Sequence, residues 1–144
     1  MPQPNFPELA FPRLWQALAA LATMSVVTLS LIPSPPQPPG PLAWDTAQHA
    51  LAYSILAVAW LQSTRAKRWE LTLAGVLFLG VVIELLQGMT EARQLQIADM
   101  LANTLGVAVG SGLCLTPFAG ALGLIDRSIA RWLGHKAQAP RQNG

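Results

Sequence analysis

Four apolar segments make up most of the chain, and they cover residues 15–32, 50–61, 71–89 and 97–115. The first contains no charged residue, and the third and fourth contain one acidic residue each. A helix needs about 20 mostly apolar residues to cross the hydrocarbon core of a bilayer. The second segment reaches that length only if Gln48 and His49 enter the membrane with it. The pattern predicts an all-α membrane protein, a four-transmembrane-helix bundle.

A soluble helical bundle is the alternative, but it would need polar faces at helical spacing, and residues 15–32 offer only one Gln and a few Thr and Ser. Beyond Pro117, apolar residues recur at helical spacing opposite Asp126, Arg127 and Arg131, which predicts a C-terminal interfacial amphipathic helix. We therefore divide the chain into a flexible Pro-rich N-terminus (1–14), a four-span domain (15–116), and an amphipathic helix with a disordered cytoplasmic tail (117–144).

The basic residues predict an orientation. Eight of the nine lie before the first segment, between the second and third, or after the fourth, and only Arg93 lies on the other side. Because Lys and Arg concentrate in cytoplasmic loops, both termini are expected in the cytoplasm. The excess of basic residues in the chain is then explained by their place in cytoplasmic segments, and it does not indicate a nucleic-acid partner.

Ionisable and amide side chains interrupt the apolar segments near their outward ends. On a helix that starts near Asp45, His49 lies one turn further along on the same face. Glu84 and Gln87 share a face of the third segment, and Asp99 and Asn103 share a face of the fourth. Charged residues in hydrocarbon cost roughly 2.5–3.5 kcal/mol on insertion scales, so they are candidates for function. The predicted polar cluster comprises Asp45, His49, Tyr53, Glu84, Gln87, Arg93, Asp99 and Asn103.

Two glycines of the fourth segment, Gly106 and Gly110, form a GxxxG pattern that lets helices approach closely in lipid. We expect them to pack one helix of this protein against another, in preference to forming a homodimer. Cys114 is the one cysteine, so the chain has no intrachain disulfide and no cysteine-based metal site.

In order along the chain, the cluster residues resemble the VanZ-like family of small bacterial membrane proteins. The pattern is Asp-x3-His-x3-Tyr, Glu-x2-Gln, Arg, and Asp-x3-Asn-x2-Gly-x3-Gly, between about residues 44 and 112. The family is named for a protein implicated in reduced susceptibility to the glycopeptide teicoplanin. The resemblance implies the bacterial cytoplasmic (inner) membrane, a role in the cell envelope, and a link to antibiotic resistance. One departure is Thr46, where the family often has a basic residue.

Three roles for the cluster follow from its charges. Arg93 would neutralise Asp99 or Glu84 in a structural role. A binding site would instead engage membrane lipid or a lipid-linked envelope precursor, and an excess of acids suits a sugar or amide headgroup, or a cation, better than a bare pyrophosphate.

Catalysis is the third role, and it ranks below the other two. Asp45 would orient His49 with Glu84 as a second acid or base, or Asp45, His49, Glu84 and Asp99 would hold a divalent metal. No recognised nucleophile or zinc motif supports an enzyme, and we assign no cofactor and no resident metal. The alternative function, of a different class, is that of a non-catalytic accessory subunit of a larger membrane complex.

Overall fold

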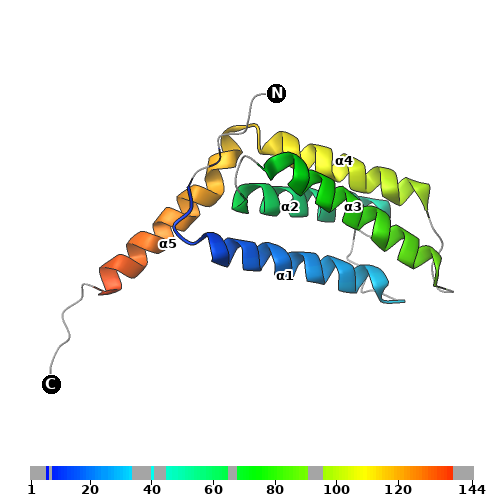
Figure 1. The fold of residues 1–144 in the computed structure, drawn as a ribbon, viewed down its shortest axis with the longest axis horizontal. Coiled ribbons are helices and arrows are strands. Elements are labelled where there is room, and N and C mark those ends of the chain that lie inside the picture. The colour runs from blue at the N-terminus through cyan, green and yellow to red at the C-terminus, as the bar shows by residue number, and fades with distance from the viewer. Residues whose placement is uncertain are drawn as a thin grey trace, which may run out of the picture.

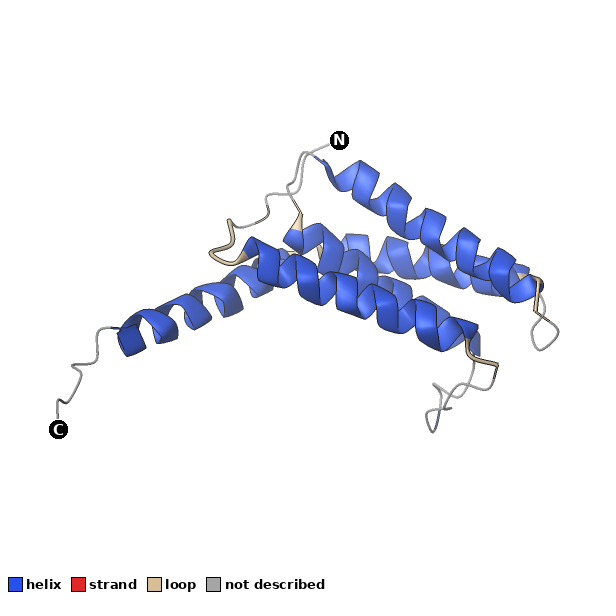
Figure 2. Ribbon diagram, turned by 60° about the horizontal axis from the view of Figure 1, so that its bottom comes forward, coloured by secondary structure: helices blue, strands red, loops and turns tan. Residues whose placement is uncertain are grey.

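A computed structural model describes residue 6 and residues 8–33, 40, 45–64, 68–90 and 96–137. Over these residues the regular secondary structure is helical, and none of it is a strand (Figures 1 and 2). The elements are α1 (Pro12–Leu31), α2 (Asp45–Ser63), α3 (Trp69–Gly88), α4 (Ile97–Leu113), the 3-10 helix η3 (Pro117–Gly120) and α5 (Ala121–Ala137). Helices α1 to α4 lie side by side, and α5 leaves the bundle at an angle (Figure 1). The all-α prediction is confirmed.

The four bundle helices alternate in direction. At one end, which we call the polar end, α1 and α3 finish while α2 and α4 begin, and Gln87 Nε2 of α3 donates to the Ser30 carbonyl of α1 at 2.8 Å. At the opposite end, Gln16 Nε2 of α1 donates to the Ser63 carbonyl of α2 at 3.1 Å. Helices α1 and α3 therefore run in the same direction, and α2 and α4 run back.

Helices α2 and α4 form the most extensive contact in the bundle, and glycines make it close. A Cβ atom added to Gly106 would lie 2.3 Å from the Ala50 carbonyl oxygen, and one added to Gly110 would lie 2.5 Å from the Ser54 carbonyl oxygen. Ser54 Oγ is 2.9 Å from the Gly106 carbonyl oxygen, which adds an interhelical hydrogen bond. Both glycines of the GxxxG pattern thus face another helix of the same chain.

The distribution of side chains is the reverse of that in a water-soluble bundle. Large apolar side chains such as Leu21, Phe78 and Leu101 are at least 60% exposed, whereas Glu84 and Asp99 are buried. In water-soluble proteins, acidic side chains are almost never fully buried unless they are paired. This distribution is compatible with a lipid environment.

Two helices, α1 and α3, are long and apolar enough to cross a membrane. A third span is possible if α4 and the segment Pro117–Gly134, bent by 77° relative to each other, count as one. The prediction of four spans is thus supported for two or three. Helix α2 does not qualify by itself because Asp45, Gln48 and His49 fill its first turns, and α4 does not qualify because it has only 17 residues.

Helix α5 differs from its prediction in one residue. Asp126 was expected on a polar face toward water, but it is completely buried. Its carboxylate accepts hydrogen bonds from the Trp15 indole Nε1 (2.8 Å) and from the backbone N–H groups of Phe11 (3.2 Å) and Ala10. These donors precede or open α1, where backbone N–H groups have no partner within the helix. Asp126 therefore fastens α5 to the start of α1.

Several predictions fall outside the described residues. They concern Arg93, most of the residues before α1, and the last seven residues of the tail. Helix α1 itself begins at Pro12, three residues before the first predicted segment, and proline suits the first position of a helix because it has no N–H to satisfy.

Candidate functional site

The polar end of the bundle gathers most of the predicted cluster. The first turns of α2 carry Asp45 and His49, the first turns of α4 carry Asp99 and Asn103, and the end of α3 carries Glu84. All but Asp45 are buried, and Asp45 is half-buried. Residues that are far apart in sequence meet here because α2 and α4 begin at the end where α3 finishes.

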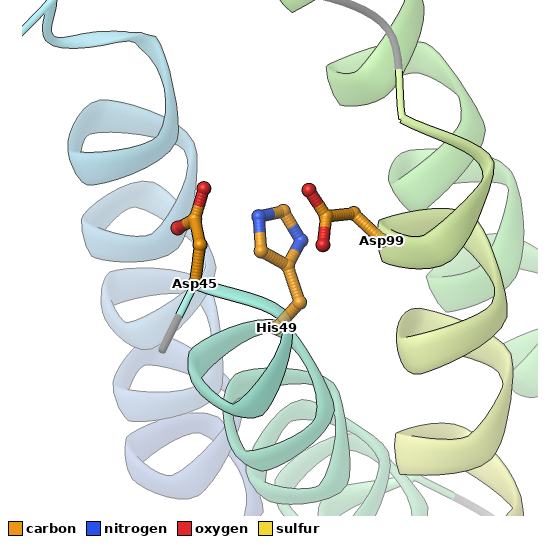
Figure 3. Close-up of side chains that lie close together, drawn as sticks. All are labelled: Asp45, His49 and Asp99. Atoms are coloured by element: carbon orange, nitrogen blue, oxygen red, sulfur yellow. The ribbon is translucent and has the colours of Figure 1, made fainter. Parts of the chain in front are cut away.

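Asp45, His49 and Asp99 form the closest group of ionisable side chains. One ligand atom from each lies within 4.8 Å of the other two, and the imidazole lies between the two carboxylates (Figure 3). His49 is 6% exposed and Asp99 is 3% exposed. One imidazole nitrogen and two carboxylate groups are a donor set that can hold a divalent metal ion. We assigned no metal from the sequence, but three of the four residues that we considered as ligands converge.

Two hydrogen bonds position this group. His49 Nδ1 lies 3.0 Å from Asn103 Oδ1, and Thr46 Oγ1 donates to Asp99 Oδ1 at 2.9 Å. We noted Thr46 only as a departure from the family pattern, and its role was missed because its partner lies 53 residues away. In the sequence, the only indication of this role is that Thr46 directly follows Asp45.

Glu84 makes a contact that the sequence did not predict. One carboxylate oxygen accepts a hydrogen bond from the backbone N–H of Gln96, the residue that caps α4. This resembles the glutamate of a capping box, except that it comes from a different helix. The predicted partner, Arg93, lies outside the described residues. The other oxygen of Glu84 is buried and has no hydrogen-bond partner.

Tyr53 and Asn103 meet at Gly80, a residue that we did not single out from the sequence. A Cβ atom on Gly80 would lie 3.1 Å from Asn103 Nδ2 and 3.1 Å from Tyr53 Cε1. Tyr53 Oη and Asn103 Nδ2 are both buried without a partner. With the second oxygen of Glu84, they are the three buried side-chain polar atoms without a partner among the described residues.

Gln87 is part of the bundle framework. Gln87 is 3% exposed, and its side-chain amide donates a hydrogen bond to the Ser30 carbonyl in the last turn of α1. It therefore ties α3 to α1 at the polar end, and we exclude it from the site.

Comparisons of the chain with protein-family models, with curated proteins and with solved structures found no match. The fold and the site define the class of protein directly. It is an all-helical protein with two or three helices able to cross a membrane, and it buries a polar cluster at one end of its bundle.

Proposed function

We propose that the chain is a VanZ-like membrane protein of four spans that binds the polar headgroup of a cell-envelope or lipid-linked ligand. We call this binding site the headgroup site. It comprises Tyr53, Glu84 and Asn103 together with the neighbouring Asp45, His49 and Asp99. The resemblance in sequence supports the family and a connection with glycopeptide resistance.

One observation carries the proposal, namely the three buried polar atoms without partners. A buried polar group left unpaired costs about 1–3 kcal/mol, so native proteins keep few of them. Tyr53 offers a hydroxyl donor, Asn103 an amide donor, and Glu84 a carboxylate acceptor. A sugar or amide headgroup has donors and acceptors that would complement all three.

The direction of the helices supports four spans. Helices α1 and α3 are the two clear candidates for spans, and they run the same way through the bundle. If both cross the membrane, the chain has to return between them, and α2 is the helix in that position. The basic residues before α1, between α2 and α3 and after α4 in the sequence support a cytoplasmic location for both termini, with the polar end facing the periplasm or the cell exterior.

Cysteine labelling tests this orientation. In a Cys114→Ala background, Met89→Cys should react with a membrane-impermeant thiol reagent on intact cells, because Met89 is 82% exposed just after α3. Glu70→Cys, on the exposed surface at the start of the same helix, should react only after permeabilisation. The reverse labelling pattern would contradict the proposed orientation.

Tyr53→Phe and Glu84→Gln test headgroup binding. Each changes an atom that has no partner in the protein, so neither should lower the stability of the ligand-free protein. The probe is a polyprenyl-pyrophosphate-linked amino sugar, added to the protein in nanodiscs and followed by native mass spectrometry. Both variants should bind the probe at least about tenfold more weakly, equivalent to about 1.4 kcal/mol. Tyr53→Phe removes a hydroxyl donor to the headgroup, and Glu84→Gln removes a carboxylate acceptor.

Glu70→Gln is the matched control for Glu84→Gln, since Glu70 is an exposed acid at the other end of α3. It should bind like the unmodified protein. The polyprenyl pyrophosphate without the sugar should bind more weakly than the complete probe. Equal binding of the probe by Tyr53→Phe, Glu84→Gln and the unmodified protein would rule out the proposed site.

A further inference from the structure

We propose that Asp45, His49 and Asp99 form a binding site for one divalent transition-metal ion of the Mn²⁺ or Zn²⁺ class. This goes beyond headgroup binding, and it stands on different atoms from the three that carry that proposal. The site draws one ligand from α4 and two from the first two turns of α2, so it would also fasten these two helices together.

The spacing of the side chains fits a shared ion. Zn²⁺ takes nitrogen and oxygen ligands at about 2.0–2.2 Å, so two ligand atoms of one ion lie at most about 4.4 Å apart. The three ligand atoms here lie within 4.8 Å of one another, and the imidazole is flanked by a carboxylate on each side (Figure 3). Small rotations of the side chains would bring all three onto one ion.

The hydrogen bond to Asn103 prepares His49 as a ligand. An amide oxygen can only accept, so His49 Nδ1 donates its proton to Asn103 Oδ1 across 3.0 Å. In the neutral imidazole this leaves the lone pair on Nε2, the nitrogen that is available to a metal. Histidines that ligate metals commonly donate their other ring N–H to a carbonyl or carboxylate in this way. Asn103 is 3% exposed and its Nδ2 has no hydrogen-bond partner, so among the described residues the bond to His49 is the hydrogen bond that holds its amide group.

Electrostatics also favour a cation. Asp99 is buried, and a carboxylate taken out of water needs a compensating positive charge or a proton. A divalent ion would balance this charge while a neutral His49 keeps its Nδ1–H bond to Asn103. Thr46 Oγ1 would fix one oxygen of the Asp99 carboxylate in position.

The donor set selects the class of ion. Imidazole nitrogen suits Zn²⁺ and carboxylate oxygen suits Mn²⁺, so a mixed set can hold either ion, whereas Mg²⁺ and Ca²⁺ favour sites made only of oxygen. Three protein ligands leave at least one coordination position open for water or for an oxygen atom of a ligand. A resident metal would therefore change the net charge that an incoming headgroup meets at the polar end.

Metal titration of the full chain tests the site. The protein is purified in nanodiscs, stripped with a chelator, and titrated with Mn²⁺ while electron paramagnetic resonance reports the free ion; Zn²⁺ is then tested by competition. We expect one ion per chain and a rise in the temperature of unfolding on binding. Asp99→Asn should weaken binding by about 100-fold, and Asn103→Ala by about 10- to 100-fold through loss of the imidazole orientation.

Matched variants keep the test decisive. Glu70→Gln removes an exposed acid far from the site and should bind the ion normally. Asp99→Asn can still accept the Thr46 hydrogen bond, and its ligand-free unfolding temperature shows whether it is folded. Absence of Mn²⁺ and Zn²⁺ binding by the folded, unmodified protein would overturn the proposal, as would normal binding by a folded Asp99→Asn variant.

The two proposals fail separately. Tyr53→Phe should lose affinity for the headgroup probe and still bind the ion, because Tyr53 is not among the three ligands. The metal site is refuted if the unmodified protein binds no ion and nitrogen NMR shows that the imidazole of His49 is doubly protonated. In that case a proton takes the place of the metal, and this conclusion does not depend on the result with the headgroup probe.

Discussion

Gly106→Ala is expected to destabilise the protein by about 3 kcal/mol, because overpacking a close contact typically costs 1–3 kcal/mol and this contact is with backbone. The added methyl carbon would lie 2.3 Å from the Ala50 carbonyl oxygen and 3.1 Å from the Ser54 backbone nitrogen. Backbone atoms of α2 cannot rotate away as a side chain can, so α2 and α4 have to separate. Thermal or denaturant-induced unfolding in detergent micelles measures the loss.

Separation of the helices should also disturb the site, because His49 lies on α2 and Asp99 on α4. We expect Gly106→Ala to weaken any ligand that both helices hold. Gly112→Ala is the control, since a Cβ atom there would have no atom within 4 Å. In a helix interior, alanine is favoured over glycine by roughly 0.5–1 kcal/mol, so this variant should be neutral or slightly more stable. Equal stability of the two variants would show that the close approach of α2 and α4 is not essential.

Asp126→Ala is expected to cost about 3 kcal/mol and to release α5 from the bundle. The substitution leaves three donors without an acceptor, namely the Trp15 indole and the N–H groups of Ala10 and Phe11. Hydrogen bonds to charged groups contribute about 1.5–3 kcal/mol each, although they do not add fully. Unfolding measurements give the stability, and a shift in the fluorescence of Trp15 reports the exposure of its indole.

Acid dependence provides a second measurement on Asp126. Burial opposes ionisation, but hydrogen bonds from Trp15, Ala10 and Phe11, with Arg127 nearby, lower the pKa of the carboxyl below its ordinary value. A lowered pKa in the folded state means that the carboxylate stabilises the fold above about pH 4 and that this contribution is lost as the pH falls through the lowered value. Asp126→Ala should lack this part of the acid dependence. Asp126→Ala with unchanged stability and an unchanged pH profile would show that the contact with α1 is dispensable.

Matched control variants exist for this prediction too. Arg131→Gln and Ser128→Ala change exposed positions of α5 that do not contact α1 through a hydrogen bond in the described structure. Both should remain close to the unmodified protein in stability, because exposed substitutions away from special features usually change stability by less than about 0.5 kcal/mol.

Sequence pattern by itself predicted the helices and most of the polar side chains that gather at one end of the bundle. Apolar runs of span length could only form helices, and the i to i+3 and i to i+4 spacings put Glu84 with Gln87 and Asp99 with Asn103 on shared faces. Because successive helices reverse direction, the ends that carry these residues had to meet. Such inferences succeed because they depend on local geometry and on the order of elements along the chain.

Tertiary structure decided which atoms meet. It paired Thr46 with Asp99, gave Glu84 the Gln96 amide to bind, and placed Gly80 under Tyr53 and Asn103. The periodicity of the sequence does not predict these contacts. A helical pattern shows which residues share a face of one helix, but it does not show how neighbouring helices are rotated or shifted relative to that helix.

Asp126 shows the physical reason most directly. Its position among charged residues of α5 predicted a solvated face, since an amphipathic pattern assumes that polar side chains point toward water. Its acceptor oxygens are instead taken by donors at the start of α1, more than a hundred residues earlier in the chain. An isolated helix cannot reveal whether a carboxylate faces water or the unpaired N–H groups of another helix, and only the packing of α5 against α1 settles it.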